Sequence, residues 1–402
     1  MKPITLNSDR PIDSEENPAS KSIIQLDRQN KYYTGIQVNL ERFQNLGHLL
    51  QPYLEQLNNN LGDCFLPDRC PLPNTLDKER AVVECFAEYQ NLDRENCWGY
   101  VGGGSSLGNL QGMWIGKTLH PEATLVFPDN AHYSIYKYSQ LLGFQKIKVI
   151  KTKEKEQLDL GDFKTQIHDR ESVILLLTAG TTMTAAYDPI DECIEILKQK
   201  QCNFYLHVDA ALGGMVIPFI TRDLDYPAPN YTFKNPNINS TTISVHKILG
   251  SPMPANVFLS RKETICDFEK RVNEVSYLGN IKDITLYGSR DGFRALAVFA
   301  RLSELNVEAI ANLVKTCLER ANYLVECLQK QGMKSVYRHP FGMAVVFPMV
   351  AFNTYFSVLS QQELYEKYNL VKSDRYVHFY AMGHVTRSLC DEFVEDCTKL
   401  QQ

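Results

Sequence analysis

Four short segments of the sequence carry side chains whose chemistry could be combined in one site. The last of them is Ser244-Val-His246-Lys247, in which a lysine directly follows an apolar segment. Burial disfavours an ammonium ion, so the pKa of such a lysine falls below its usual value of about 10.4 and the neutral amine becomes a nucleophile for an aldehyde. Taken alone, this segment is also compatible with a solvated lysine.

A carboxylate ends another apolar segment, His207-Val-Asp209-Ala-Ala211. An acidic side chain at the carboxyl end of a buried strand usually has a cationic partner or a catalytic role. Asp209 can therefore hold a protonated ring nitrogen, and a buried salt bridge is the alternative. Because Asp209 and Lys247 lie on different predicted strands, we expect them to converge at one edge of a sheet.

A glycine-rich segment, Val101-Gly-Gly-Gly-Ser-Ser-Leu-Gly-Asn109, joins a predicted strand to a predicted helix. Its small residues let backbone N–H groups approach a phosphate, and the helix dipole adds about 0.3–1 kcal/mol for an anion. Ser105 and Ser106 can also donate hydroxyl hydrogen bonds. The glycines have neither the spacing of a dinucleotide site nor a following Gly-Lys-Ser/Thr, so an ordinary turn is the alternative.

The fourth segment, Asp129-Asn-Ala-His132-Tyr-Ser134, places an imidazole at the start of the next predicted helix, where it can lie flat on an aromatic ring. A histidine without a ligand is the alternative. Together the four segments supply what pyridoxal phosphate needs. They offer an amine for its aldehyde, a carboxylate for its pyridine nitrogen, a flat side chain for its ring and a helix start for its phosphate.

The elements that position these side chains follow an alternating pattern from Trp98 onward. Short apolar segments alternate with helix-length segments, which favours a mostly parallel sheet with helices packed on it. The predicted strands are 124–127, 147–150, 173–178, 204–208, 242–245 and 256–259. The predicted helices between them are 108–119, 132–142, 160–167 and 190–200.

Three parts are expected along the chain, because 402 residues are too many for one simple core. Residues 1–75 are expected to form an N-terminal arm and a helix over 40–57. Residues 76–300 form a large cofactor-binding domain that begins with a helix over 77–89, and residues 301–402 form a small C-terminal domain. A helix over 302–331 is predicted to lead into the small domain, in which 343–347 and 377–381 are predicted strands.

The composition excludes several other classes of protein. A net charge of −5 without a basic block makes nucleic acid an unexpected partner. No apolar segment approaches the length of about 20 residues that a membrane helix needs, and residues 1–10 lack the apolar core of a secretory signal, so we expect a cytoplasmic protein with no membrane partner. The 11 cysteines are odd in number and include no C-x-x-C pair, which argues against disulfides and metal sites.

The sequence resembles the group II pyridoxal-phosphate-dependent amino-acid decarboxylases, in particular the branch of bacterial histidine decarboxylases and plant serine decarboxylases. The resemblance runs from about residue 33 to residue 393. It rests on seven motifs in the family's order, namely Leu57–Asp63, Trp98–Val101 with the glycine-rich segment, Asp129–Ser134, Gly180–Thr184, Asp209–Ala211, Ser244–Lys247 with Gly250–Pro252, and Gly288–Gly292.

The resemblance implies an α/β fold of the aspartate-aminotransferase type, a homodimer with its active site at the subunit interface, and decarboxylation of a small amino acid, with histidine to histamine as the first candidate. It implies that Lys247 is the Schiff-base lysine, that His132 stacks on the pyridine ring and that Asp209 pairs with the pyridinium nitrogen. Tyr277 matches a tyrosine that we expect to close over the site and to return a proton to Cα; a simple surface tyrosine is the alternative. The implied cofactor contacts, with no metal ligand among them, are Ser105, Ser106, His132, Thr178, Asp209, Ala211, Ser244, His246 and Lys247.

Three residues depart from the family pattern. Leu107 stands where glutamate is usual, Phe293 where histidine is common and Gly383 where proline is usual. None of them removes a residue that the cofactor chemistry requires, and the first two can alter the substrate pocket or the packing of loops. Serine and aromatic amino acids stay open as substrates, as do another reaction of the same cofactor and a non-catalytic protein of this fold.

Overall fold

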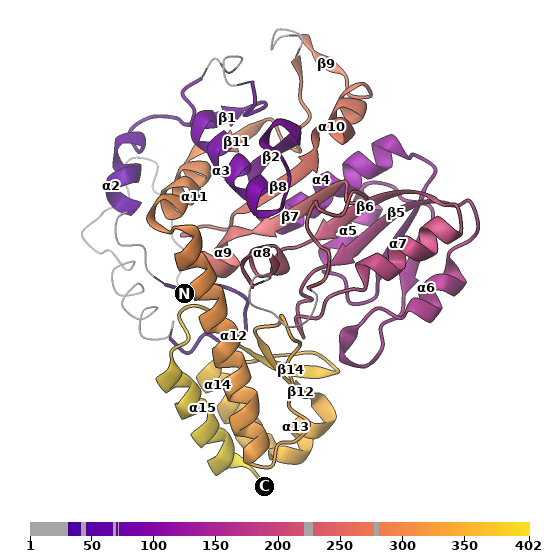
Figure 1. Ribbon diagram of the computed structural model, residues 1–402. Helices are drawn as coiled ribbons and strands as arrows, with labels where there is room; N and C mark the ends of the chain where they lie inside the picture. The colour runs from indigo at the N-terminus through magenta and orange to yellow at the C-terminus, as the bar shows by residue number, and fades with distance from the viewer. Residues whose placement is uncertain (1–30, 42–45, 67–69, 71, 221–227, 277–280) are drawn as a thin grey trace, which may run out of the picture.

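A seven-stranded sheet lies at the centre of the computed structural model, which describes residues 31–41, 46–66, 70, 72–220, 228–276 and 281–402 (Figure 1). Its strand order is β2-β8-β7-β6-β5-β3-β4. In chain order the strands are β2 Cys97–Gly102, β3 Thr124–Pro128, β4 Ile147–Ile150, β5 Ser172–Thr178, β6 Asn203–Asp209, β7 Ser240–Ser244 and β8 Asn256–Arg261. Strands β7, β6, β5, β3 and β4 run parallel, whereas β8 is antiparallel to both β2 and β7. The predicted mostly parallel sheet is confirmed.

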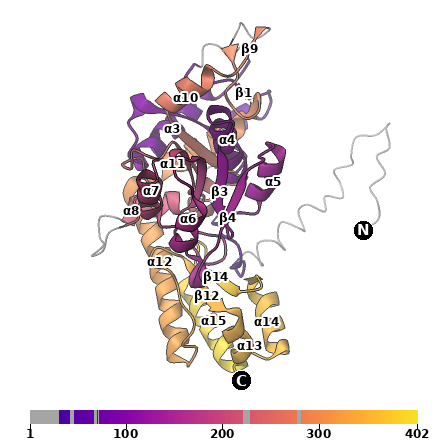
Figure 2. The same ribbon diagram turned by 90° about the vertical axis from the view of Figure 1, so that its right-hand side faces the viewer.

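Helices cover both faces of this sheet. On one face lie α4 (Ser105–Leu119) and α5 (Ser134–Leu141), and on the other lie α3 (Leu76–Tyr89), α7 (Ile190–Gln199) and α8 (Ile217–Ile220) (Figure 2). Helix α6 (Leu160–Gln166) packs against β4 and α7. Each predicted helix and strand between 77 and 259 is present, with ends that differ by at most three residues.

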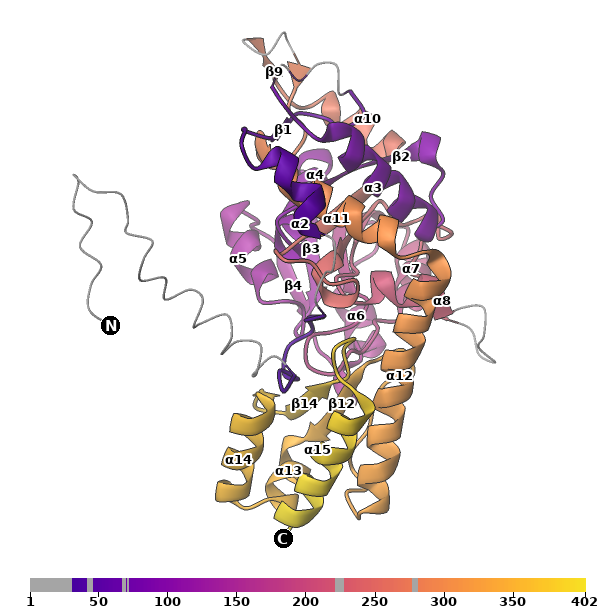
Figure 3. The ribbon, with the colours of Figure 1, turned by 90° about the vertical axis from the view of Figure 1, so that its left-hand side faces the viewer.

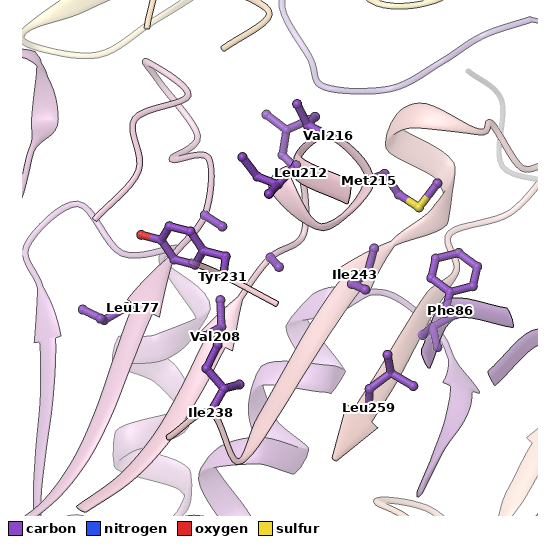
Figure 4. Close-up of a cluster of buried hydrophobic side chains, with 14 of the residues drawn as sticks. Phe86, Leu177, Val208, Leu212, Met215, Val216, Tyr231, Ile238, Ile243 and Leu259 are labelled. Atoms are coloured by element: carbon purple, nitrogen blue, oxygen red, sulfur yellow. The ribbon is translucent and has the colours of Figure 1, made fainter. Parts of the chain in front are cut away.

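Strand β5 has an almost continuously apolar sequence, SVILLLT, and its position in the sheet explains this. Alternate side chains of a strand point to opposite faces, and here both faces are buried. Leu175 and Leu177 belong to the core that contains α3, α7 and α8, whereas Ile174 and Leu176 belong to the core of α4 and α5. Figure 4 shows the first of these cores, where Phe86 of α3 lies near side chains of the central strands.

Glycines let α4 lie close against the carboxyl half of the sheet. A Cβ atom at Gly108 would lie 2.1 Å from Oγ1 of Thr242, and one at Gly112 would lie 2.4 Å from Nδ1 of His207. No larger residue fits either position without a shift of the sheet. Gly104, which precedes the helix, has a φ of 131°, a conformation that favours glycine. These glycines therefore fix the position of the helix start that the sequence predicted as a phosphate site.

The small C-terminal part contains a three-stranded sheet of order β12-β14-β13 (Ala344–Pro348, Tyr376–Tyr380 and Val371–Lys372). Helices α13 (Met349–Tyr355), α14 (Val358–Tyr368) and α15 (Arg387–Leu400) accompany it, and the long helix α12 (Val307–Lys330) runs beside α15 (Figure 3). Both predicted strands of this part are present, each shifted by one residue.

Two predicted helices were wrong in extent. The helix over 302–331 is interrupted, because α11 (Gly292–Glu304) ends there and Asn306 caps a new helix, α12, by accepting a hydrogen bond from the N–H of Ala309. The helix over 40–57 is reduced to α2 (Leu46–Leu50) and the 3₁₀ turn η1 (Gln51–Tyr53), and residues 42–45 lie outside the described residues. Leu57 is 66% exposed, so its apolar side chain gives a longer helix no packing.

The remaining predictions about organisation have different outcomes. Within the described residues no helix is both long and apolar enough to cross a bilayer. Over the same residues, no group of three or more His, Cys, Asp or Glu side chains is placed to hold a metal ion. The division into 1–75, 76–300 and 301–402 stays our proposal, and the arm over 1–30 lies outside the residues that the structure describes.

A buried ion pair joins the segments that flank the glycine-rich loop. Glu79 of α3 and Arg290 of β11 (Ser289–Asp291) are each 1% exposed, and Oε2 lies 3.0 Å from Nη2. The same carboxylate accepts hydrogen bonds from the backbone N–H of Val101, 2.8 Å away, and from Nδ2 of Asn60, 2.8 Å away. The pair thereby connects β1 (Asn59–Leu61), α3, β2 and β11.

We expect Glu79→Ala to lower the free energy of unfolding by about 3–5 kcal/mol, because Arg290 would remain as an unpaired buried charge. The measurement is urea unfolding of the purified protein. Glu84→Ala, which removes the partner of the half-exposed Arg80 on the same helix, is the control and should cost less than about 1 kcal/mol. Equal losses of unfolding free energy for the two variants would show that the buried ion pair stabilises the fold no more than the surface pair does.

Candidate active site

A cavity of about 240 Å³ opens at the carboxyl edge of the large sheet. Its lining residues are Gly103, Gly104, Ser105, Ser106, Leu107, Asn109, His132, Asp209, Ala211, Ser244, His246, Lys247 and Pro254. Every predicted cofactor contact except Thr178 is among them. Each comes from the carboxyl end of a strand or the segment after it, because parallel strands place these ends at one edge of a sheet.

Lys247 is half-buried in the short helix α9 (Val245–Ile248), which directly follows β7. Burial lowers the pKa of its amine to about 8, although the charge of Asp209 opposes this shift. Nζ donates a hydrogen bond of 2.5 Å to Oε1 of Gln37. The amine therefore has a larger neutral fraction near pH 7 than an exposed lysine, as the sequence predicted.

Gln37 is a site residue that the sequence analysis missed. Its Nε2 donates to the hydroxyl of Tyr380, 2.6 Å away, and to the carbonyl oxygen of Thr182, 3.1 Å away. A carbonyl oxygen only accepts hydrogen bonds, so the amide nitrogen must point there and Oε1 must face Lys247. Because Gln37 lies outside all motifs, in a segment without regular structure, no signal in the sequence could have found it.

Asp209 is held in place by a chain of buried polar groups. Its Oδ2 accepts from Nδ2 of Asn109 at 2.6 Å, and its Oδ1 accepts from the backbone N–H of Ala211 at 3.1 Å. Oδ1 of Asn109 lies 3.0 Å from Nε2 of His207, whose Nδ1 lies 2.8 Å from Oγ of Ser240.

The tautomer of His207 follows from this chain. Burial lowers the pKa of His207 to about 4, so the imidazole is neutral. Since Asn109 donates through Nδ2 to Asp209, its Oδ1 must accept, which leaves Nε2 of His207 as the donor and Nδ1 as the acceptor of the Ser240 hydroxyl. Asn109 and His207 lie within quoted motifs, but their supporting role was not predicted, because it depends on contacts across the sheet.

Hydroxyl and backbone donors gather at the start of α4. Oγ of Ser105 lies 2.8 Å from Oγ of Ser244, and Oγ1 of Thr242 donates to Oγ of Ser105 at 3.3 Å. Oδ1 of Asn256 accepts from the N–H of Gly104 at 2.9 Å and so orients the turn before the helix. A helix start with adjacent hydroxyls is a ready site for a phosphate.

His132 stands at the mouth of this cavity and lines it. Its Nδ1 lies 2.7 Å from Oγ of Ser134, and its ring centre lies 4.4 Å from that of Tyr133. Burial lowers the pKa of the imidazole, so the ring is mostly neutral near pH 7. A neutral flat ring in this place is suited to stacking on an aromatic cofactor.

Thr178 lies beside Asp209, its register partner on the neighbouring strand. Its N–H donates to Oδ2 of Asp188 at 2.7 Å, and burial raises the pKa of Asp188 to about 7. Oγ1 of Thr178 and Oδ1 of Asp188 are buried and have no hydrogen-bond partner within the described part of the chain. A polar ring substituent beside Asp209 would satisfy the threonine hydroxyl, which fits an aromatic cofactor with such a group. Tyr277, by contrast, lies outside the described residues.

Two of the three departures from the family pattern lie where they bear on the site. Leu107 lines the cavity with its apolar side chain. A Cβ atom at Gly383 would lie 2.6 Å from Nδ2 of Asn39, which donates to the carbonyl oxygen of Ile248 at the end of α9. Glycine at 383 therefore leaves room for a side chain that ties the N-terminal segment to the helix of Lys247.

The fold and this set of donors define a pyridoxal-phosphate enzyme of fold type I. Residues 112–353 match the model of the pyridoxal-dependent decarboxylase conserved domain. The chain belongs to the pyridoxal-dependent decarboxylase family. It is a pyridoxal-phosphate-dependent amino-acid decarboxylase, a carboxy-lyase.

Similar proteins come from plants and bacteria. The chain is 31% identical over 358 residues to serine decarboxylase 3 of Oryza sativa subsp. japonica, which covers 87% of this chain and 75% of that protein. It is 30% identical over 379 residues to a histidine decarboxylase of Solanum lycopersicum, covering 92% and 85%. The crystal structure of L-methionine decarboxylase from Streptomyces sp. 590 has the same fold, with a TM-score of 0.81 at 19% identity over 96% of this chain and 94% of that one.

Proposed function

We propose that the amino acid that this chain decarboxylates is L-histidine, which gives histamine and CO₂. The main structural support for a decarboxylase function is that Lys247, Asp209 and His132 line one cavity at the start of α4. Support for histidine comes from relatives that are named histidine decarboxylases, among them that of Vibrio campbellii at 30% identity over 353 residues. Serine is the second candidate, since a serine decarboxylase matches the chain as well.

The roles proposed for the cavity residues follow from their positions. When bound, pyridoxal phosphate supplies an aldehyde for an amine and a protonated ring that takes up the electron pair left by departing CO₂. Ser105, Ser106, Ser244 and His246 bind the phosphate, with the N–H groups at the start of α4. Asp209 keeps the ring nitrogen protonated, and its charge favours the developing electron pair. His132 and Ala211 enclose the ring, and Thr178 donates its free hydroxyl to a ring substituent.

Lys247 has two proposed tasks in this scheme. Its amine would hold the cofactor through the aldehyde carbon between turnovers, and would be free while a substrate amine takes that place. Oε1 of Gln37 lies 2.5 Å from Nζ and gives the released amine an acceptor, so the amine stays oriented in a buried site. Tyr277 is proposed to return the proton to Cα of the substrate.

We propose further that two copies of the chain form a homodimer with the site at their interface. Tyr133, which directly precedes α5, is 73% exposed although its ring lies next to that of His132, and Leu141 at the far end of α5 is 68% exposed. Apolar side chains exposed beside a cavity favour a partner surface. Light scattering of the purified protein tests this proposal, and a strictly monomeric active enzyme contradicts it.

A screen of the twenty amino acids tests the proposed substrate. The purified, cofactor-loaded protein is expected to release CO₂ from histidine with the highest kcat/KM and to form histamine in equal amount. A preference for serine or an aromatic amino acid would contradict histidine as the substrate but would leave the decarboxylase function in place. Formation of a keto acid or an aldehyde without CO₂ from every amino acid, or no turnover at all, contradicts the proposal as a whole.

A further inference from the structure

A second cavity of about 400 Å³ adjoins the first, and His132 lines both. It lies between loops of the large part and the β13–β14 turn of the small part. Its lining residues are Asp129, Asn130, Ala131, His132, Tyr133, Glu156, Thr182, Met183, Ser373, Asp374 and Arg375. Because His132 lines both cavities, a substrate bound in the first cavity could place its side chain in the second.

Glu156 is the most deeply buried charged side chain of this lining, with a residue exposure of 5%. It ends the 3₁₀ turn η4 (Glu154–Glu156), and its φ is 61°, next to a φ of 63° at Lys155. The left-handed region is sterically unfavourable for residues other than glycine. The chain thus keeps a buried carboxyl group at a position whose backbone suits glycine, which points to a use for that carboxyl.

Within the described residues, only one oxygen of the Glu156 carboxyl group accepts hydrogen bonds. Oε2 accepts hydrogen bonds from the hydroxyls of Thr181 and Thr184, each 3.1 Å away. Within the described part of the chain, Oε1 has no hydrogen-bond partner. The two threonines therefore fix the carboxyl group, and its second oxygen stays available to a ligand in the cavity.

The other charged groups around the cavity leave an excess of acid. Asp129 accepts from the hydroxyl of Thr152 at 2.7 Å, Asp374 lies on the turn of the small part, and Arg375 beside it is exposed. Burial raises the pKa of Glu156, while the nearby Arg375 charge opposes that shift. Three carboxyl groups face one guanidinium and the imidazole of His132, so the cavity is suited to a cation.

We propose that Glu156 is a specificity residue that accepts a hydrogen bond from a cationic or N–H-bearing side chain of the substrate. The amino acids preferred by the enzyme then carry an imidazole, an ammonium or a guanidinium group. This inference rests on the proposed decarboxylase function and deepens it by naming the substrate class. A buried carboxylate with a free oxygen gains most from a charged donor, and an apolar side chain would leave it unsatisfied.

The test compares four enzymes, the unchanged protein and three variants, on two groups of substrates. Glu156→Gln keeps the shape and removes the charge, and Glu156→Gly removes the side chain and suits the left-handed backbone. Glu154→Gln makes the same charge change on an exposed residue of the same turn and is the matched control. The substrates are histidine, lysine and arginine on one side and norleucine and phenylalanine on the other.

We expect Glu156→Gln to lower kcat/KM for the preferred cationic substrate by about 10–100-fold, mainly through KM, because a charged hydrogen bond is lost. Values for the apolar substrates should stay within about twofold, and Glu154→Gln should match the unchanged enzyme on all substrates. Calorimetric binding of the matching amine product to the loaded enzyme should weaken by the same factor. Glu156→Gly should lose the preference equally while its Tm stays the same or rises.

Two results for the Glu156 variants overturn the inference. One is an unchanged ratio between cationic and apolar substrates in both Glu156 variants. The other is a fall in Tm for both variants with equal loss on all substrates, which would make Glu156 a link between loops. Decarboxylation of an apolar amino acid by all four enzymes alike removes the inference but leaves the decarboxylase function, whereas absence of any decarboxylation removes the function itself.

Discussion

Lys247→Ala is expected to reduce decarboxylation by more than about 10³-fold, because among the described residues no other amine lines the cavity to attach the cofactor. The variant should also lose the visible absorbance that a lysine-bound cofactor gives. Its fold should survive, because the lysine side chain makes one hydrogen bond within the described residues, to Gln37, and burial disfavours its charged form. Steady-state CO₂ release and an absorbance spectrum of the loaded protein measure the two effects.

Lys262→Ala is the control, since it removes an exposed lysine at the start of α10 (Lys262–Glu269). It should keep full activity and absorbance. A Lys247→Ala enzyme that kept both activity and absorbance would show that Lys247 does not attach the cofactor, whatever the fold of the chain. Loss of activity with loss of secondary structure by circular dichroism would instead place the lysine among structural residues.

The amine itself can be titrated without the cofactor. Because burial lowers the pKa of Lys247 to about 8, the reactive neutral form should dominate above pH 8 and fade below it. The rate at which an amine-directed reagent labels this residue in the cofactor-free protein, read by mass spectrometry, should rise through a midpoint near pH 8. A midpoint near the usual pKa of about 10.4 would show that the site is open to solvent.

The sequence predicted the sheet and its helices well because their signal is local. Strand β5 and strand β6 are buried on both faces, so their residues read as apolar runs whatever the rest of the chain does. The cavity residues could be placed for a related reason. Asp209 and Lys247 follow such strands directly, and parallel strands bring their carboxyl ends to one edge.

What the sequence did not predict depends on contacts between distant segments. Gln37 contacts Lys247, which lies 210 residues away in the sequence, and Asn109 contacts His207, which lies 98 residues away. No periodic pattern in the sequence predicts either contact. The break before α12 was missed because the apolar spacing continues past Asn306, although asparagine is strongly preferred at helix N-caps. The left-handed backbone at Glu156 was also hidden, since nothing in its residue type suggests it.

Asp209→Ala separates binding of the cofactor from the chemistry that follows. Lys247 remains in this variant, so the absorbance of the loaded protein should persist while kcat falls by about 10²–10³-fold, the range for loss of one preorganised charge. The deciding variant is Asp209→Asn, which can keep the hydrogen bond to Ala211 and nearly the same shape but carries no charge. If the charge holds the ring nitrogen protonated, Asp209→Asn should be nearly as slow as Asp209→Ala, with KM changed far less than kcat. An amide variant within about fivefold of the unchanged enzyme would mean that Asp209 serves through its hydrogen bonds alone. In that case the chain from Ser240 through His207 and Asn109 would be a scaffold for the loop of Ala211 and not a support for a catalytic charge.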